Sequence, residues 1–565
     1  MDKRTYLGIF LIFLVLIVWS LMMSKSSQKL VESDSASGEL KTKSEEITVN
    51  KKEKKEAIKL SSKQAIKQPN YQATESPEIL DTVDTKLFSI VLSRVGASIK
   101  SIKLKEYKGV EENFVELVPE GEKVLSGVIE KIDLTDGIFD LVERNENRLV
   151  YELLRPIFDT EQVKKIYEFN DSSYIFELEV DGVGERHKIL WDSGLRTTEK
   201  NKEMEFRYFG GVTRFGGSTF FKNVGTLDTI PKGEQGNIKW VGAKNKYFLA
   251  AIIPLVETEG YTMRRAALGN VGGGCMRGCV PAGKVNPDAT KVKVSLSTWS
   301  GEAHKFKVYI GPLDYDILKS AGYELEDACY FGFKWIRPIS RFFLKILLAL
   351  YKFIPNYGIV IIVFSIVLGL AFFPLTKMSQ QSAMGMQHLQ PKLEELKKKH
   401  KKDPKGLNQA TMELYRKQGV NPFSGCLPLL IQMPIFFALY AILDTTIALR
   451  GAVFIPGWIE DLSQPDTPPF LPIPLLPILM GGMMFLQQKV QSKGIKGPAQ
   501  QQQKMMMYMM PIMFTFIFLR FPSGLVLYWF IYNIFSFVQT SIIKSGLGRS
   551  GSQTVPTLPT GGMRR

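Results

Sequence analysis

Hydrophobic and polar residues alternate in short runs along the chain from about Thr85 to about Ile310. Phe88–Leu92, Ile99–Leu104 and Tyr174–Val180 are examples, with apolar residues at about every second position. A period near two indicates strands that bury one face, and turn residues separate these short runs. The pattern therefore predicts an antiparallel β-sandwich over residues 85–328.

Long apolar runs replace this alternation in the rest of the chain. They cover about Tyr357–Leu375, Pro428–Ile447, Leu471–Leu486, Met505–Leu519 and Leu525–Ile543. Such runs are candidate transmembrane helices. The third and fourth runs are short for a hydrocarbon core of ~30 Å, which favours local thinning of the bilayer.

Another apolar run, Tyr6–Met23, stands behind a short charged start. It is longer than the apolar core of most signal peptides and has no clear small-residue cleavage site. We therefore expect an uncleaved membrane anchor over residues 1–24, with a cleaved signal peptide as the alternative. With the five later runs, the anchor makes six membrane spans.

Two segments are too polar to form a packed core. Residues 25–84 are rich in Ser, Lys, Glu and Gln, which predicts a disordered linker. Residues 545–565 form a short cytoplasmic tail without a long basic extension, so only weak binding to ribosomes is expected.

Residues 329–353 combine cationic and bulky apolar side chains. The cations recur at helical spacing and are Lys334, Arg337, Arg341, Lys345 and Lys352. A cationic stripe opposite aromatic and aliphatic residues is typical of a helix that lies in the lipid interface. Five charges disfavour a transmembrane helix here. We expect Pro338 to bend the helix.

Residues 377–419 are polar, yet they keep a helical period. A turn signal at Asp403–Gly406 divides them into a predicted cytoplasmic helical hairpin. Its basic cluster, a candidate docking site for ribosomes or anionic lipid, consists of Lys397, Lys398, Lys399, Lys401 and Lys402. A purely structural, solvated hairpin is the alternative.

The net charge of +16 arises from 72 Lys and Arg against 56 Asp and Glu. Much of the excess lies in the loops after the second and fourth membrane spans, whereas the loop after the third is acidic. Positive loops stay in the cytoplasm, so both termini are expected inside and the sandwich in the periplasm. Charge placed beside membrane segments favours lipid over direct binding of nucleic acid.

No cofactor or metal site is expected. Gly278–Val285 resembles a phosphate-binding loop but ends in Val where Ser or Thr is needed for magnesium. Cys275 and Cys279 lack further ligands at metal-binding spacing, and a disulfide or two free thiols remain open. The sandwich offers only His187 and His304, which favours a scaffold or partner-binding surface over a carbohydrate enzyme.

Polar residues interrupt the apolar spans, among them Ser365, Gln432, Thr515, Asn533 and Gln539. At membrane depth such residues face a cavity or bond to another helix, and both interpretations remain open. The many methionines of the last spans suit a surface that accepts varied sequences, although ordinary packing explains them equally well.

Several long motifs occur in one order along the chain. They are Trp240–Phe248, Phe373–Lys377, Asn421–Phe436, Pro477–Gly481 and Phe521–Trp529. In these motifs the chain resembles the YidC family of membrane insertases, in particular its Gram-negative branch with a large periplasmic domain. The resemblance implies an α+β protein, with a polytopic membrane bundle of six spans and a five-helix core beside the periplasmic sandwich.

The resemblance also implies a hydrophilic groove open to cytoplasm and lipid, and an outer face along which a client's apolar segment slides. Groove positions are Ser365, Gly369, Gln432, Thr515 and Asn533. Positions on the sliding face are Met433, Pro434, Phe436, Ile517, Tyr528 and Trp529. The family usually carries an arginine where this chain has Gly369, which leaves the charge of the groove undefined.

The resemblance implies a chaperone of the bacterial inner membrane and not an enzyme. Expected partners are nascent membrane proteins, the Sec translocon, lipids and, weakly, the ribosome. A transporter or channel is the alternative, but no repeat relates the halves of the membrane part, as transporters often show. A membrane-anchored carbohydrate enzyme is a further alternative.

Overall fold

The computed structural model describes residues 78–549, apart from internal gaps at 110–112, 131, 155–161, 183, 185, 268–289, 302, 401–402, 419–426 and 493–497. The chain divides into two compact units. A β unit takes the described residues up to Asn245 together with Ala250–Ile310, and a helical unit takes Lys246–Leu249 and the residues from Gly311 onward. The expected N-terminal anchor, most of the linker, and Cys275 and Cys279 lie outside the described residues.

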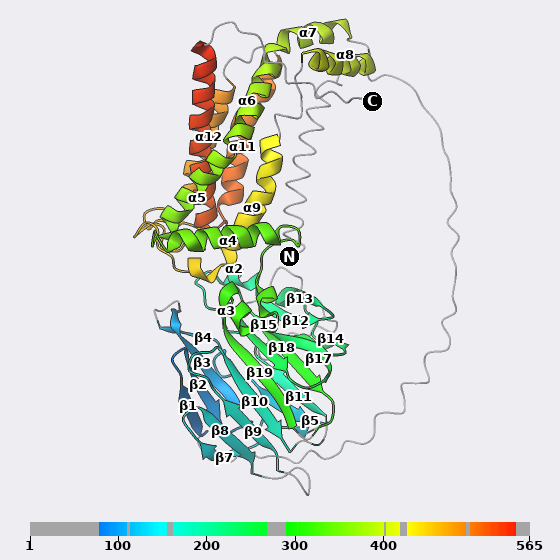
Figure 1. Cartoon of the computed structure of the whole chain (residues 1–565), viewed down its shortest axis with the longest axis vertical. Helices are drawn as coiled ribbons and strands as arrows, with labels where there is room; N and C mark the ends of the chain where they lie inside the picture. The colour runs from blue at the N-terminus through cyan, green and yellow to red at the C-terminus, as the bar shows by residue number, and fades with distance from the viewer. Residues whose placement is uncertain are drawn as a thin grey trace, which may run out of the picture. The chain divides into compact units, whose positions relative to one another are not determined.

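The β unit contains three sheets (Figure 1). The first has the order β1 (Leu80–Asp84), β2 (Phe88–Ser93), β3 (Ser98–Lys108), β4 (Phe114–Glu116). The second has the order β13 (Ser218–Asn223), β12 (Gly210–Phe215), β15 (Ile238–Lys244), β16 (Phe248–Pro254), β19 (Ala303–Pro312), β10 (Ile175–Asp181), β9 (Lys164–Glu168), β8 (Arg148–Leu153), β7 (Phe139–Arg144). The third has the order β14 (Lys232–Gln235), β17 (Thr258–Ala267), β18 (Thr290–Thr298), β11 (His187–Trp191), β5 (Ser126–Ile129), β6 (Ile132–Asp133). Short helical segments are α2 (Lys202–Phe206) and η1 (Val224–Thr226).

Alternating side chains build the core of this unit. Along β10, Phe176, Leu178 and Val180 are buried, while the residues between them are more exposed. β10 pairs antiparallel with both β9 and β19, so that Leu178 lies opposite Tyr167 and Phe306. The antiparallel sheet predicted from the period of two is thus confirmed.

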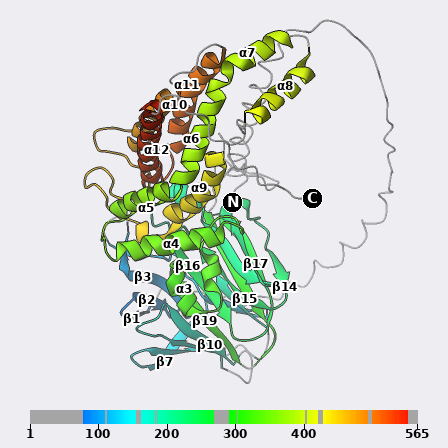
Figure 2. The same cartoon turned by 45° about the horizontal axis from the view of Figure 1, so that its top comes forward.

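The helical unit contains α3 (Tyr315–Ala321), η3 (Leu325–Ala328), α4 (Arg337–Tyr351), α5 (Tyr357–Ala371), α6 (Phe373–His388), α7 (Gln390–Lys399), α8 (Pro404–Lys417), α9 (Leu427–Thr445), η5 (Ile447–Leu449), α10 (Leu476–Gln491), α11 (Pro498–Phe518) and α12 (Ser523–Arg549). α5, α6, α9, α10, α11 and α12 form the bundle, and α4 runs across the ends of α5 and α9 (Figures 1 and 2). The bundle has a continuous apolar core that includes Phe364, Leu439, Met480 and Leu525.

α4 is shorter than the helix expected over residues 329–353. It begins at Arg337, and residues 329–336 make bends and turns. Pro338 lies in the first turn instead of bending the helix, because a first-turn N–H has no helical partner to lose. One face buries Phe343 and Leu347, and the other exposes Phe342.

The described residues contain fewer candidate membrane-spanning helices than the six spans predicted from the sequence. Among the described residues, one helix is long and apolar enough to cross a membrane, Ser523–Ile543 of α12. A second would be the pair α5 and Phe373–Ser382, which is bent by 54°. The apolar parts of α9 and α11, Ile431–Thr445 and Met507–Phe518, are shorter than a standard span. α10 begins at Leu476 and not at Leu471, because Pro472 and Pro474 favour extended backbone before it.

α7 and α8 lie side by side as a helical hairpin (Figure 2). Asp403 begins α8 by accepting a hydrogen bond from the backbone N–H of Gly406 at 2.9 Å, and Pro404 follows as its first residue. This is the turn that the sequence predicts. A third helix, α6, begins before them at Phe373. The polar residues 377–419 therefore belong to three helices and not to the two that were predicted.

Two predicted domain limits are wrong. The linker was expected to reach residue 84, but Leu80–Asp84 form β1 because they pair with β2. The sandwich was expected to reach residue 328, but the β unit ends at Ile310. α3 and η3 belong to the helical unit, where the ring of Tyr315 packs on that of Phe331 at 5.5 Å.

Candidate functional site

α12 carries a line of buried polar residues on an otherwise apolar helix. Asn533, Ser536 and Thr540 are spaced three and four residues apart and therefore share one side of the helix. Ser536 Oγ accepts a hydrogen bond from Gln487 Nε2 of α10 at 2.8 Å. Asn533 Nδ2 and Thr540 Oγ1 are buried and have no hydrogen-bond partner among the described residues. A buried amide needs a polar partner, since leaving it unsatisfied costs about 1–3 kcal/mol.

A second polar contact joins α9 to α12. Gln432 Nε2 donates to the Tyr528 hydroxyl at 2.5 Å, and both side chains are buried. The sequence placed Gln432 in the groove and Tyr528 on the sliding face, whereas the structure holds both in the bundle interior. A buried phenol hydroxyl usually finds a hydrogen-bond partner, and Gln432 supplies it.

Gly369 of α5 lies against α12. A Cβ atom at this position would lie 2.4 Å from Cδ1 of Phe535. The Gly369 carbonyl accepts a hydrogen bond from Gln539 Nε2 at 3.2 Å. The glycine therefore permits close approach of two helices, and a larger residue has no room here unless Phe535 moves.

The hydroxyl groups of the other two predicted groove residues both donate to backbone carbonyls. Ser365 is buried, and its Oγ donates to the carbonyl of Ile361 on its own helix at 2.6 Å. Thr515 Oγ1 donates to the carbonyl of Pro477 on α10 at 3.4 Å. A Cβ atom on Gly481 would lie 2.1 Å from Thr515 Oγ1, so α10 and α11 also approach closely at a glycine.

Aromatic rings gather where α9, α11 and α12 meet. Phe436 and Trp529, both predicted for the sliding face, pack edge to face with centroids 5.2 Å apart. Phe518 lies 5.9 Å from Phe436 and 5.7 Å from Trp529. Met433, Pro434 and Ile517 are half-buried. Phe518 was not singled out in the sequence, because a single aromatic residue in an apolar run gives no signal of its own.

α11 exposes an apolar stripe beside this cluster. Tyr508, Ile512 and Phe516 are spaced by four residues, and Phe516 is 70% exposed. Sequence reasoning chose the neighbouring Ile517 and missed this stripe, although the spacing of four could have identified it. Gln487, Ser536 and Thr540 were missed as well, and the same helical spacing was the available signal.

The basic cluster of the hairpin lies partly within the described residues. Lys397, Lys398 and Lys399 are exposed in the last turn of α7, where cations interact favourably with the helix dipole. Lys401 and Lys402 lie outside the described residues.

The two histidines of the β unit lie together inside it. The rings of His187 and His304 are 5.5 Å apart, and both side chains are buried. Burial lowers the pKa of His187 well below its ordinary value. Nearby, burial lowers the pKa of Lys165 to about 7, and its Nζ donates to the carbonyls of Gly96 and Leu125. Groups enclosed in this way do not line an open cleft.

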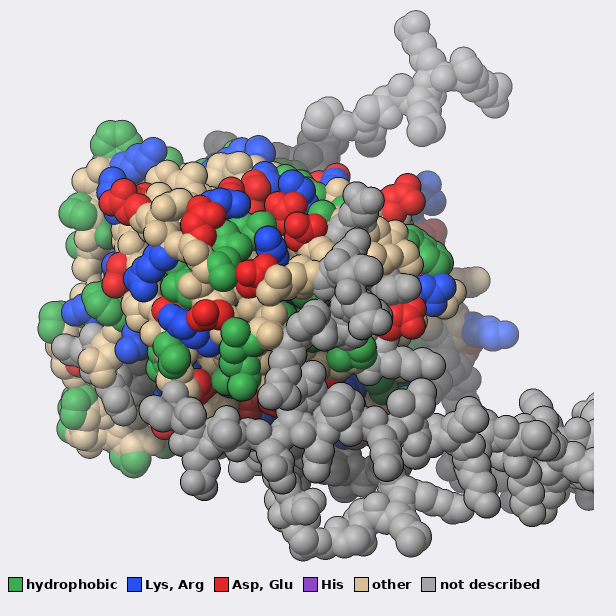
Figure 3. Space-filling view, turned by 90° about the horizontal axis from the view of Figure 1, so that it is seen from below, with side chains coloured by type: hydrophobic (Ala, Val, Ile, Leu, Met, Phe, Trp, Pro, Cys, Tyr) green, Lys and Arg blue, Asp and Glu red, His purple; other side chains and the backbone are tan. Residues whose placement is uncertain are grey.

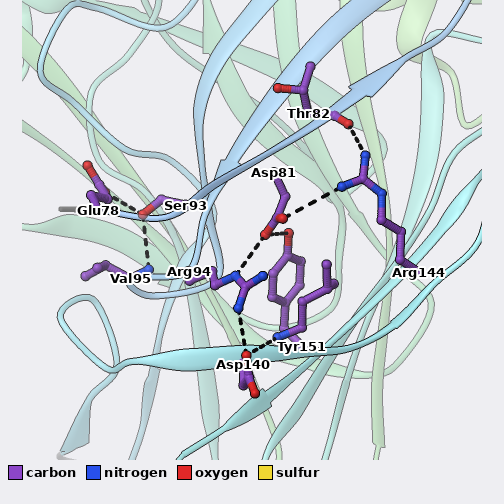
Figure 4. A network of polar contacts seen from close by, with 10 residues as sticks. Glu78, Asp81, Thr82, Ser93, Arg94, Val95, Asp140, Arg144 and Tyr151 are labelled. Carbon is purple, nitrogen blue, oxygen red and sulfur yellow. Dashed lines mark hydrogen bonds and ion pairs between the residues drawn. The ribbon is translucent and has the colours of Figure 1, made fainter. Parts of the chain in front are cut away.

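Other polar networks of the β unit join its sheets. Asp81 of β1 accepts from the Tyr151 hydroxyl of β8 at 3.1 Å and pairs with Arg94 Nε at 3.3 Å (Figure 4). Arg94 also pairs with Asp140 of β7 at 2.7 Å. These contacts connect the four-stranded sheet to the nine-stranded one, and the partners offset the cost of burying Asp81.

The face of the β unit in Figure 3 carries acidic and basic side chains interspersed with apolar ones. Ion pairs between neighbouring strands of this unit also combine both signs of charge. Examples are Arg148–Glu168 at 3.0 Å and Lys305–Glu179 at 3.2 Å. Mixed charge is typical of a solvated surface and not of a single-sign binding patch. Within the described ranges, no three His, Cys, Asp or Glu residues come together as metal ligands.

An antiparallel β unit followed by an apolar helical bundle with a buried polar line is typical of a membrane protein that also carries a large folded domain. Comparison with known proteins gives the family. Residues 81–346 match the family model "YidC periplasmic domain", and residues 349–549 match "60Kd inner membrane protein". The chain belongs to the YidC family.

Curated relatives extend along nearly the whole chain. A "Membrane protein insertase YidC" of Chlorobium limicola is 31% identical and is aligned over 96% of this chain and 95% of its own length. The protein of the same name from Syntrophus aciditrophicus is 34% identical over 82% of this chain and 84% of its own. A solved structure described as "Active YidC insertase crystal structure with the first transmembrane domain resolved" is 19% identical, with 83% and 92% coverage and a TM-score of 0.34.

Proposed function

We propose that this chain is a membrane protein insertase of the bacterial inner membrane, and that nascent membrane proteins are its substrates. Two relatives that are named membrane protein insertases align with 96% and 82% of this chain. Insertion involves no bond chemistry. The free energy comes from moving apolar client surface into lipid, at ~25 cal/mol per Å².

The buried polar line of α12 is the observation that carries the proposal for the mechanism. Asn533, Ser536 and Thr540, with Gln432 and Gln487 opposite, would receive the polar tail of a client within an apolar bundle. The amide of Asn533 has hydrogen-bonding capacity to spare for such a tail. The role proposed for three other groove positions is to let neighbouring helices approach closely, more than to offer polar groups to the client. These positions are Ser365, Gly369 and Thr515.

The apolar segment of the client would follow the face made by Phe436, Trp529 and the exposed α11 stripe. Met433, Pro434 and Ile517 border this face, and Phe516 is its most exposed aromatic residue. The short length of α10, 16 residues or ~24 Å, supports a locally thinned bilayer, which lowers the barrier to a polar tail.

The topology proposed from the loop charges places both termini in the cytoplasm and the β unit in the periplasm. Six spans then comprise the N-terminal anchor, α5 with the start of α6, α9, α10, α11 and α12. α4 would lie in the lipid interface, and the lysines of α7 would contact the ribosome weakly or bind anionic lipid. Cooperation with the Sec translocon is a further part of the proposal.

A matched pair of variants tests the polar line. Asn533→Leu removes the unsatisfied amide, whereas Val538→Leu makes a similar side chain at an exposed position of the same helix. We expect Asn533→Leu to slow insertion of a small Sec-independent client into proteoliposomes, and Val538→Leu to leave the rate unchanged. Equal rates for both variants and the native chain would refute a role for the polar line.

A further inference from the structure

A fully buried ion pair lies among the described residues of the helical unit. Lys246 Nζ lies 3.0 Å from Asp444 Oδ1, and the two side chains are 0% and 1% exposed. Lys246 belongs to the tetrapeptide Lys246–Leu249, which is part of the helical unit although it is distant from the helices in sequence. Asp444 is the penultimate residue of α9.

The tetrapeptide is held by the loop between η5 and α10 as well as by α9. Lys246 Nζ also donates to the carbonyl of Ser463 at 3.2 Å, and the Tyr247 hydroxyl donates to Ser463 Oγ at 2.7 Å. The same loop contacts the first residue of α12, since the backbone N–H of Ser523 donates to the carbonyl of Gln464 at 2.7 Å and Ser523 Oγ donates to the carbonyl of Asp461 at 3.1 Å. One short peptide therefore connects the end of α9 to the start of α12.

Each of these two buried charges is stabilised by the other. A carboxylate at the last turn of α9 lies next to the negative end of the helix dipole, which disfavours it. Lys246 compensates both the carboxylate and the helix end. Burial opposes the charged lysine, but the interactions with Asp444 and Tyr247 together outweigh it and raise the pKa of Lys246. Such pairs are seldom more stable than apolar residues of the same size, so geometric specificity is a better reason for one.

We propose that Lys246 and Asp444 are a positioning pair that sets how α9 meets α12. These two helices carry the Gln432–Tyr528 hydrogen bond and the Phe436–Trp529 contact on which the proposed client path depends. With the pair intact, the end of α9 and the start of α12 share one set of contacts around Ser463. Without it, the helices still pack but lose the fixed relation between their facing side chains.

Two readouts test the pair, and only one of them rests on the proposed insertase function. The first is the initial rate of client insertion by the full chain in proteoliposomes. The second is disulfide formation between Phe436→Cys and Trp529→Cys, in a chain whose four native cysteines are replaced. If the native chain fails to insert any client, the function is wrong, but the cross-link still reports on the pair.

The decisive variant is the apolar double replacement Lys246→Met with Asp444→Leu. We expect it to melt no lower than the native chain, to insert clients about tenfold more slowly and to form the cross-link less readily, because small misplacements are costly. Restored cross-linking in the reversed pair, Lys246→Asp with Asp444→Lys, would support the proposal further. Native values for both readouts in the apolar double variant would overturn it.

If the apolar double variant does not fold, Lys246→Arg tests the positioning role instead. Arginine keeps the charge but presents a wider, planar group. We expect a folded chain with slower insertion and weaker cross-linking. Native rates would show that charge alone is required, and the positioning role would be wrong.

Discussion

Gly369 provides the sharpest stability test of the helix bundle. Gly369→Ala adds one carbon atom at 2.4 Å from Phe535 Cδ1 and 2.7 Å from its Cε1. Carbon atoms pack best at about 3.5–4.0 Å, so the ring or the helix must move by roughly 1 Å. Overpacking of this kind costs about 1–3 kcal/mol, and alanine returns about 1 kcal/mol through its helix propensity. We expect a net loss of about 1 kcal/mol or slightly more.

The control is Gly482→Ala on α10, where nothing lies within 4 Å of the added atom. Only the propensity term acts there, so stability should stay unchanged or rise by up to about 1 kcal/mol. Thermal unfolding of the full chain in detergent measures both variants. A double-mutant cycle with Phe535→Ala should show coupling, because removing the ring relieves the clash at Gly369.

Three results would refute this reasoning. They are equal effects of Gly369→Ala and Gly482→Ala, additive effects in the cycle, and undisturbed stability of Gly369→Arg. The same contact predicts that an arginine at this position requires Phe535 to be truncated first. We therefore expect that Gly369→Arg alone is not tolerated in the native packing of α5 against α12.

Two further predictions concern charge. Because the pKa of Lys165 is about 7 when folded and 10.5 otherwise, stability should decline as the pH falls from about 10.5 to about 7. The lowered pKa of His187 extends the decline below pH 6.5, and unfolding curves of Lys165→Met should lack the upper part of this slope. Replacing Lys397, Lys398 and Lys399 by Glu should weaken binding to anionic vesicles by roughly a hundredfold or more. The reason is that each lysine near an anionic surface contributes about 1 kcal/mol of binding free energy. Vesicle flotation measures this loss; unchanged binding, or a changed melting temperature, would contradict a docking role.

Periodicity in the sequence predicted the elements that bury one face. The alternation in Phe88–Leu92 and Tyr174–Val180 became β2 and β10, since an antiparallel strand places every second side chain in the core. The turn at Asp403 followed from local cap chemistry. Features set by a few neighbouring residues were therefore accessible before the fold was known.

Features that depend on distant residues were not accessible. The resemblance to the family assigned Tyr528 to the sliding face, but only the position of Gln432 shows that its hydroxyl points inward. The pairing of Lys246 with Asp444 spans almost two hundred positions, and neither residue stands in a pattern that predicts the other. The role of Gly369 likewise required knowledge of which ring lies opposite.

The central claim is that this chain inserts membrane proteins into the bilayer. It is tested by reconstituting only the purified chain into proteoliposomes and adding a small Sec-independent client, with protease protection of the client's translocated tail as the readout. The account predicts protection well above that in vesicles without the chain, at a rate that needs no nucleotide. Protection equal to that of empty vesicles, by a chain shown to be folded, would contradict it.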